Sequence, residues 1–245
     1  MVKESARKFL VARFSGDNFW WGWEKIVILL LKSIFNNRKI GVVVAYALLT
    51  AVFKKKYFDM NTSFVFFADG FEEVEALTTV DIMRRAGMEV ITVSINPSLE
   101  ARGAHGVVVK ADALLSDVDL NDAEWLICPG GMPGASNLAA CPTLTDALVA
   151  QHGKGGKIAA ICASPSVIFG PLGLLDGKHA VCYPGMESGM TGAIVGTESV
   201  AVDNNIVTGN GPAAAAAFAL AIVEASKGEA VARQVAEGML LFHLI

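Results

Sequence analysis

From about Asn61 to the C-terminus, the sequence predicts an α/β domain with an open, mostly parallel sheet covered by helices on both faces. Short, continuously apolar runs recur along it, which is typical of strands buried on both faces of a parallel sheet. Segments with helical end signals lie between these runs, and this alternation implies parallel strands joined by helices. All 8 prolines and most of the glycines follow Met60, so turns begin there.

The first predicted elements form a strand-helix-strand unit. Ser63–Ala68 is an aromatic, apolar run bounded by an Asp-Gly pair, as expected of a buried strand. Phe71–Ala86 is predicted as a helix because glutamates occupy its first turn, two arginines its last turn, and a glycine follows. Glu89–Ser94 is the second strand. Asn96–Gly106 is expected to be an irregular excursion at the edge of the sheet, leading into Val107–Val109.

The middle of the domain repeats this alternation. Trp125–Cys128 is predicted as a buried strand that enters Pro129–Gly134, a turn whose glycines allow backbone N–H groups to point at a ligand. Thr143–His152 is expected to be a helix ended by a glycine. Lys157–Ile161 is the next strand, and Ser164–Leu172 is a helix opened by a proline.

The last predicted elements complete the sheet and cover it. Ala180–Cys182 is expected to be a short strand. Val200–Asp203 and Ile206–Thr208 are predicted to form a hairpin across an Asn-Asn turn. Ala213–Ser226 and Glu229–Leu241 are expected to close the chain as two helices.

Residues 1–59 differ from residues 60–245, and we treat the two as separate parts. The first part holds 11 Lys/Arg and 4 Asp/Glu, whereas the rest is acidic. Its apolar runs, Ile26–Leu31 and Ile40–Phe53, are shorter than the roughly 20 residues that span a bilayer, although the second could lie in a membrane interface. We expect the extension to be a start-site artefact, with Met60 as the natural start, and the alternative is a membrane-associated segment.

The composition of the domain also limits its partners. An acidic domain without Lys/Arg clusters lacks the electrostatic footprint that nucleic acid requires, so we predict no nucleic-acid partner. The cysteines, Cys128, Cys141, Cys162 and Cys182, show no metal-ligand spacing. We therefore expect reduced thiols, a cytoplasmic location and no metal site.

Cys162 is the candidate reactive residue. It stands where the strand Lys157–Ile161 must turn abruptly into a helix, and its small neighbours permit the strained turn that exposes a nucleophile. The helix N-terminus beside the sulfur favours a thiolate, which predicts a pKa below the reference of about 8.5. The backbone N–H groups of Gly131 and Ala163 could stabilise an oxyanion. Taken alone, a cysteine after a buried strand is more often an inert core residue.

Five motifs occur in order, namely Asp69–Glu75, Val80–Gly87, Cys128–Gly134, Ala159–Ala163 and Gly209–Pro212, the last followed by Phe218–Glu224. Their order resembles the ThiJ/PfpI superfamily, in particular its DJ-1 branch with bacterial ThiJ-like members, over nearly all of the domain. The resemblance implies a flavodoxin-like fold of the class I glutamine amidotransferase type. It also implies that Cys162 is the nucleophilic, oxidation-prone cysteine, that a protonated Glu75 hydrogen-bonds its sulfur, and that Gly131 and Ala163 supply the backbone donors.

Two further residues depart from the pattern of the family. Some relatives carry a histidine near the cysteine where this sequence has Tyr183, so a peptidase is not expected. His105 stands where DJ-1 carries an arginine at its dimer interface. If a similar homodimer forms, His105 is expected to approach the partner subunit's active site as a proton shuttle.

The resemblance leads to two alternative functions, neither of which needs a cofactor. One is a glyoxalase or deglycase, in which Cys162 attacks methylglyoxal, a related 2-oxoaldehyde or a glycated protein thiol or amine. The other is a non-enzymatic redox sensor or chaperone-like stress protein that uses oxidation of the same cysteine.

Overall fold

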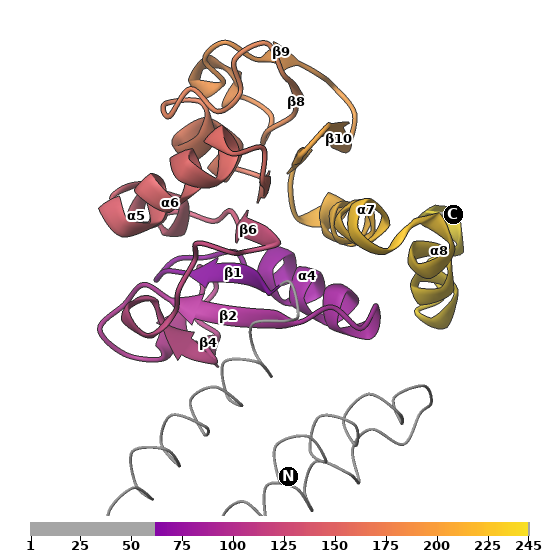
Figure 1. Cartoon of the computed structure of the whole chain (residues 1–245), viewed down its shortest axis with the longest axis horizontal. Coiled ribbons are helices and arrows are strands. Elements are labelled where there is room, and N and C mark those ends of the chain that lie inside the picture. The colour runs from indigo at the N-terminus through magenta and orange to yellow at the C-terminus, as the bar shows by residue number, and fades with distance from the viewer. Residues whose placement is uncertain (1–61, 245) are drawn as a thin grey trace, which may run out of the picture. The chain divides into compact units, whose positions relative to one another are not determined.

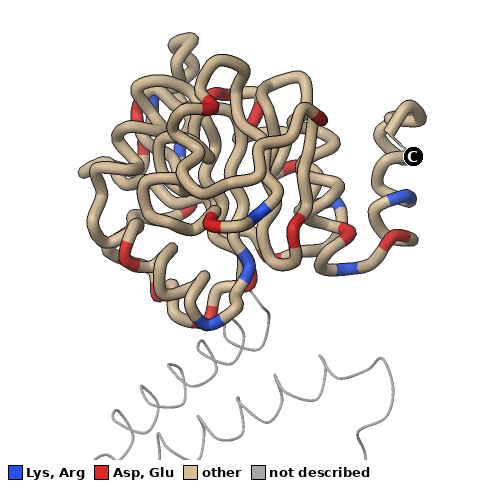
Figure 2. The backbone as a smooth tube through the Cα atoms, turned by 90° about the horizontal axis from the view of Figure 1, so that it is seen from above, with Lys and Arg blue, Asp and Glu red and all other residues tan. Residues whose placement is uncertain are grey.

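The computed structural model describes residues 62–244. The extension at residues 1–59 and the boundary predicted at Met60 lie outside the described residues. Within the described range, no helix is both long and apolar enough to cross a membrane. Lys and Arg residues are spread over this domain among more numerous Asp and Glu residues (Figure 2).

Seven strands form the central sheet, in the order β10-β11-β7-β6-β1-β2-β5. Neighbouring strands are parallel except for β10, which runs antiparallel to β11 at one edge. This confirms the predicted open, mostly parallel sheet. The strands are β1 (Ser63–Phe67), β2 (Val90–Ser94), β5 (Ala113–Leu114), β6 (Trp125–Cys128), β7 (Lys157–Ile161), β10 (Val200–Asp203) and β11 (Ile206–Gly209).

Strand β1 shows why both faces of the sheet are apolar. All of its residues are buried. Val65 and Phe67 contribute to one hydrophobic cluster and Phe64 and Phe66 to another, because successive side chains of a strand point to opposite faces. A continuous apolar run therefore fills two separate cores.

Helices cover the two faces separately. One core takes side chains from α4, α7 and α8 and only Ala135 from α5, and the other takes side chains from α5 and α6. Figure 1 shows these two groups on opposite sides of β1 and β6. The helices are α4 (Glu73–Arg85), α5 (Gly134–Ala139), α6 (Pro142–Gly153), α7 (Ala215–Lys227) and α8 (Glu229–Gly238), with a π-helical turn at Pro165–Phe169 and 3-10 turns at Leu115–Asp117, Glu187–Gly189, Pro212–Ala214 and Phe242–Leu244.

The excursion after β2 is more ordered than expected. Its residues form an antiparallel ribbon of β3 (Glu100–Arg102) and β4 (Val108–Lys110), which is separate from the main sheet. The chain then returns as the edge strand β5, which the sequence analysis missed because two residues are too short for a periodic pattern.

Two predicted elements near the site were wrong in extent. Instead of a helix over Ser164–Leu172, a π-helical turn spans Pro165–Phe169, and Pro171 has no N–H with which to continue the helical hydrogen bonds. Instead of a sheet strand over Ala180–Cys182, β8 (His179–Ala180) pairs with β9 (Ile194–Val195) in a separate small sheet.

The order of the strands determines where a ligand can bind. From β1 the chain moves to β2 and β5 on one side, and it then returns to place β6 on the other side of β1. The loops after β1 and β6 lie side by side at the carboxyl ends of these strands, because the N–H of Glu72 donates to the carbonyl of Gly130 at 2.9 Å and that of Gly134 donates to the carbonyl of Gly70 at 3.2 Å. Ligands of open parallel sheets bind at this edge. The loops after β6 and β7 meet at this edge, and they carry Gly131 and Cys162.

Candidate active site

Cys162 occupies a strained elbow directly after β7. Its φ of 65° lies in the left-handed region, which residues other than glycine seldom adopt. Two hydrogen bonds hold this backbone: the N–H of Cys162 donates to the carbonyl of Gly209 at 2.9 Å, and its carbonyl accepts from the N–H of Tyr183 at 2.8 Å. The elbow is thus braced by neighbouring segments, as a positioned nucleophile requires.

The glycine loop after β6 packs directly against this elbow. Gly131 has a φ of 88°, and a Cβ there would lie 2.4 Å from the backbone nitrogen of Glu72. A Cβ on Gly130 would lie 2.5 Å from the Cβ of Cys162 and 2.7 Å from Oε2 of Glu75. Both positions therefore require glycine so that the loop can approach the sulfur.

The backbone N–H groups of Gly131 and Ala163 lie close enough to the sulfur of Cys162 to favour its negative charge and lower its pKa. A hydroxyl hydrogen bond ties the two loops together, since Oγ of Ser164 donates to the carbonyl of Pro129 at 2.5 Å. The two predicted backbone donors thus both lie at the thiol.

Glu75 approaches the same sulfur from the first turn of α4. Its side chain is fully buried. Oε2 accepts the N–H of Gly130 at 2.8 Å, and the carboxyl group lies close enough to the thiol of Cys162 for each group to shift the pKa of the other. Oε1 is buried and has no hydrogen-bond partner among the described residues. This oxygen can therefore carry the proton when Glu75 is neutral.

Burial raises the pKa of Glu75 to about 7, and the nearby charge of Glu72 adds to this effect. The hydrogen bonds from Cys162 and Gly130 act in the opposite direction and are outweighed. A carboxyl group with this pKa can take up or release a proton near neutral pH, which suits an acid–base catalyst.

The thiol itself departs from the sequence-based expectation. Burial, together with the charge of Glu75 and its hydrogen bond, raises the pKa of Cys162 to about 12, although the N–H groups of Gly131 and Ala163 lower it. The predicted depression below free cysteine is therefore wrong, because the backbone donors do not offset desolvation and a neighbouring carboxylate.

These two shifts describe one pair of coupled groups. Near neutral pH the thiol and the carboxyl group lose one proton between them, since losing the second would leave two negative charges side by side. A proton can thus pass from sulfur to Glu75 at the moment the sulfur forms a bond.

Of the two auxiliary residues, Tyr183 contacts Cys162 through its backbone, whereas His105 pairs with other residues. The backbone of Tyr183 touches Cys162, while its side chain is about half exposed and lies against Gly211. His105 is exposed on the turn between β3 and β4, where it pairs with Glu73 and Glu72. Its predicted approach to a partner subunit stays a prediction.

The family model described as the DJ-1/PfpI family matches residues 62–225. The chain belongs to this family. The match spans the strands, the glycine loop, the cysteine elbow and most of α7, so the resemblance read from the motifs is confirmed.

Individual family members agree with this assignment. Protein DJ-1 homolog B of Arabidopsis thaliana is 37% identical over 71% of this chain, which spans only 40% of that relative's length. A protein of Caenorhabditis elegans named glutathione-independent glyoxalase DJR-1.2 is 35% identical over 64% of this chain and 83% of its own length. The structure of oxidized Toxoplasma gondii DJ-1 is 38% identical and covers 73% of this chain and 97% of its own, with a TM-score of 0.71. The family thus includes a protein named as a glyoxalase, and the fold is shared across its members.

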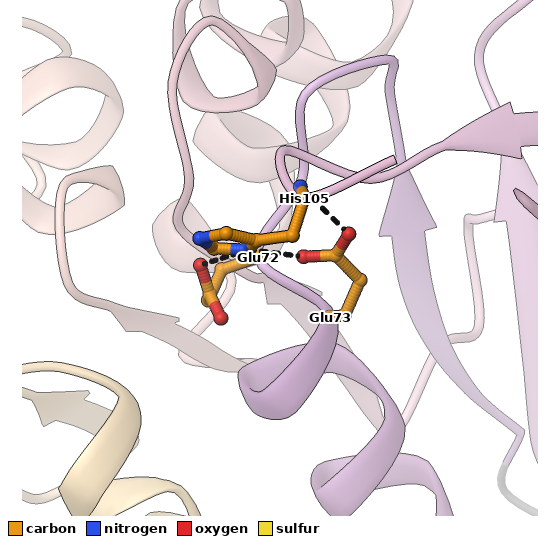
Figure 3. Close-up of side chains that lie close together, drawn as sticks. All are labelled: Glu72, Glu73 and His105. Carbon is orange, nitrogen blue, oxygen red and sulfur yellow. Dashed lines mark hydrogen bonds and ion pairs between the residues drawn. The ribbon is translucent and has the colours of Figure 1, made fainter. Parts of the chain in front are cut away.

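The sequence analysis missed Gly130 and the contacts of Glu72 and Glu73. It treated both glutamates only as acids that stabilise the start of a helix. They do lie at the start of α4, where a negative charge is favourable. Their proximity to His105 depends on how the β3–β4 turn folds back, and no local signal indicates that. Among the described residues, Glu72, Glu73 and His105 form a group whose possible ligand atoms lie within 4.8 Å of one another (Figure 3).

Proposed function

We propose that this protein is a cofactor-independent glyoxalase or deglycase that acts on methylglyoxal, related 2-oxoaldehydes or their adducts with protein thiols and amines. The observation that carries the proposal is the thiol of Cys162 on its elbow, in contact with a carboxyl group that titrates near neutral pH. The glyoxalase name of the C. elegans relative supports the same reaction class.

The first step is addition of the thiol to the aldehyde carbon. As the C–S bond forms, the thiol proton passes to the Glu75 carboxylate, and the π electrons of the C=O bond move to oxygen. The N–H groups of Gly131 and Ala163, which act on the sulfur, are the donors proposed to stabilise this oxyanion. Transfer of the proton from Glu75 to the oxygen then gives a neutral hemithioacetal.

The second step moves hydrogen within the substrate. Glu75, again a carboxylate, removes the proton from the former aldehyde carbon, and the resulting enediol is reprotonated on the neighbouring carbon. The product is a thioester of a 2-hydroxy acid, and water cleaves it to free the acid and restore the thiol. No external electron donor or acceptor is needed, because one carbon is oxidised while its neighbour is reduced.

The test is turnover of methylglyoxal to lactate by the purified full chain without added glutathione or metal. We expect activity in the natural protein and none in Cys162→Ser, with circular dichroism used to verify that the variant folds. Equal turnover by the variant would exclude Cys162 as the nucleophile, and absence of turnover in the natural protein would exclude the enzyme.

A redox function of the same residue is the second candidate. The relative from Toxoplasma gondii is described as oxidized, and the donors around Cys162 suit a sulfinate as well as an oxyanion. Because peroxide reacts with the thiolate, the raised pKa of Cys162 favours slow oxidation and so favours the enzyme. If peroxide oxidised Cys162 faster than free cysteine, and the protein did not turn over methylglyoxal, the redox function would be favoured over the enzyme.

We further propose a cytoplasmic homodimer. All four cysteines are free, which suits a reducing compartment. Val74 and Leu77 of α4, Val107 of the turn before β4 and Val108 of β4 are exposed apolar side chains, and exposed apolar side chains favour association. A monomeric mass for the full chain in light scattering, or an unchanged dimer in Val74→Lys, would contradict the proposed dimer face.

A further inference from the structure

The turn between β3 and β4 is bound to the start of α4, beside the candidate active site. The N–H of Ala104 donates to the carbonyl of Phe71 at 2.8 Å, and the N–H of Gly70 donates to the carbonyl of Arg102 at 2.7 Å. Figure 3 shows His105 of this turn facing Glu72 and Glu73. The turn therefore places an exposed, titratable side chain next to the loop that carries the site.

Glu73 is the main anchor of the turn. Its Oε1 accepts the N–H of His105 at 2.8 Å and that of Val107 at 3.4 Å, while Oε2 pairs with Nδ1 of His105 at 2.8 Å. Burial opposes the charge, but these hydrogen bonds outweigh it and lower the pKa of Glu73. Because protein donors already occupy both of its oxygens, we do not assign a metal ion to this group.

Glu72 links this anchor to the catalytic pair. Its carboxylate lies 3.5 Å from Nδ1 of His105. Its N–H donates to the carbonyl of Gly130 at 2.9 Å, and Gly130 in turn donates to Glu75. The charge of Glu72 acts on Glu75 and raises its pKa.

The charged groups facing His105 are few. Glu72 and Glu73 face it from α4, and both their charges favour the protonated imidazole, so the pKa of His105 is raised. On its own ribbon, the guanidinium of Arg102 bonds the carbonyl of Gly106. Cys162 and Glu72 are the titratable groups that act on Glu75.

We propose that His105 is a positioning residue whose positive charge, held between Glu72 and Glu73, sets the pH range in which Glu75 accepts the thiol proton. When His105 is protonated, it offsets part of the negative charge of Glu72. When it loses its proton, the uncompensated Glu72 makes a second carboxylate at Glu75 less favourable. The role rests on the proposed function of Glu75 as the base.

The test measures the rate of Cys162 alkylation by iodoacetamide against pH, by mass spectrometry of the Cys162 peptide, alongside methylglyoxal turnover. In the natural full chain, alkylation is expected to rise near pH 7, because Glu75 loses its proton there and its carboxylate can then accept the proton of the attacking thiol. In His105→Gln we expect this rise to move to higher pH by about half a unit, the size of an exposed charge pair. His105→Lys, which keeps the positive charge, is expected to restore the position of the natural protein.

Glu72→Gln provides the matched control. Removing the charge of Glu72 is expected to move the rise to lower pH, and in this background His105→Gln is expected to have no further effect. An unmoved rise in His105→Gln, or an equal shift in both backgrounds, would overturn the proposal. If His105→Gln does not fold, Glu72→Gln alone tests the proposal. In that case, an alkylation rate that rises at the same pH in Glu72→Gln as in the natural protein overturns the proposal.

The two readouts separate this proposal from the proposed function. A purely structural role of His105 would lower the rate at every pH, without moving the rise and without rescue by lysine. Lack of turnover together with a shifted alkylation profile would exclude the enzyme and retain the role of His105. Turnover with an unshifted profile would retain the enzyme and exclude that role.

Discussion

Cys128 and Cys162 stand at the carboxyl ends of two neighbouring parallel strands, β6 and β7, yet their surroundings differ. Cys128 is the last residue of its strand, pairs in register with Ala160, and is fully buried in one hydrophobic core. Cys162 lies one residue beyond its strand, has a left-handed backbone and is 8% exposed. Its sulfur meets backbone N–H groups and a carboxyl group, whereas burial alone raises the pKa of Cys128.

The difference shows that the residue type does not decide reactivity. A shift of one position past the strand end, combined with a positive φ, places a sulfur that is still largely buried beside backbone N–H groups and a carboxyl group at the carboxyl ends of the strands.

The largest expected effect is a separation of activity from stability between the two cysteines. Cys162→Ser is expected to lower methylglyoxal turnover by roughly 10³-fold or more, because it replaces the nucleophile. Cys128→Ser is expected to retain turnover but to lose about 1–3 kcal/mol of unfolding free energy, because it buries an unpaired hydroxyl. Urea denaturation and lactate assays measure both, and loss of turnover in a folded Cys128→Ser would remove the contrast.

Glu75→Gln comes next. The amide can still accept the N–H of Gly130, but it cannot take up the thiol proton. We expect a fall in turnover of about 10²- to 10⁴-fold and loss of the rise in rate near pH 7. A variant that keeps this rise would show that another group carries the proton.

Gly130→Ala tests the packing between the loop and the elbow. The added Cβ would lie 2.5 Å from the Cβ of Cys162 and 2.7 Å from Oε2 of Glu75, so the pair must separate. We expect turnover to fall by about 10²-fold and stability by about 1–3 kcal/mol. Gly153→Ala is the control, since its Cβ meets nothing within 4 Å and both quantities should be unchanged.

The last effect leaves turnover aside and is a dependence of stability on pH. Because the pKa of Glu75 is raised from 4.5 to about 7, the folded protein holds a proton that the unfolded chain releases between these values. Stability from this residue is therefore present below pH 4.5 and is lost as the pH rises to 7, by up to about 3 kcal/mol. Glu75→Gln should thus be more stable than the natural protein at pH 8 and equal to it near pH 4.5, and an opposite trend in thermal denaturation would contradict the raised pKa.

Much of the fold could be predicted because its signals are local. Ser63–Ala68, Trp125–Cys128 and Lys157–Ile161 were each predicted to within a residue, since buried parallel strands are apolar throughout. The helix at Gly134–Ala139 was missed because its residues resemble a turn, and the glycine is needed there: a Cβ on Gly134 would lie 2.5 Å from the nitrogen of Phe71. The small sheets depended on contacts that a single segment does not reveal.

The sequence by itself determined the alternation of strands and helices, the glycine loop after one strand and the cysteine at the junction of another. Each of these follows from side-chain size, hydrophobicity and backbone freedom at neighbouring positions. Only the tertiary structure decided the proton affinities of Cys162 and Glu75 and the pairing of His105 with Glu73. Those properties depend on desolvation and on the distances between charges that lie far apart along the chain, and folding alone brings them together.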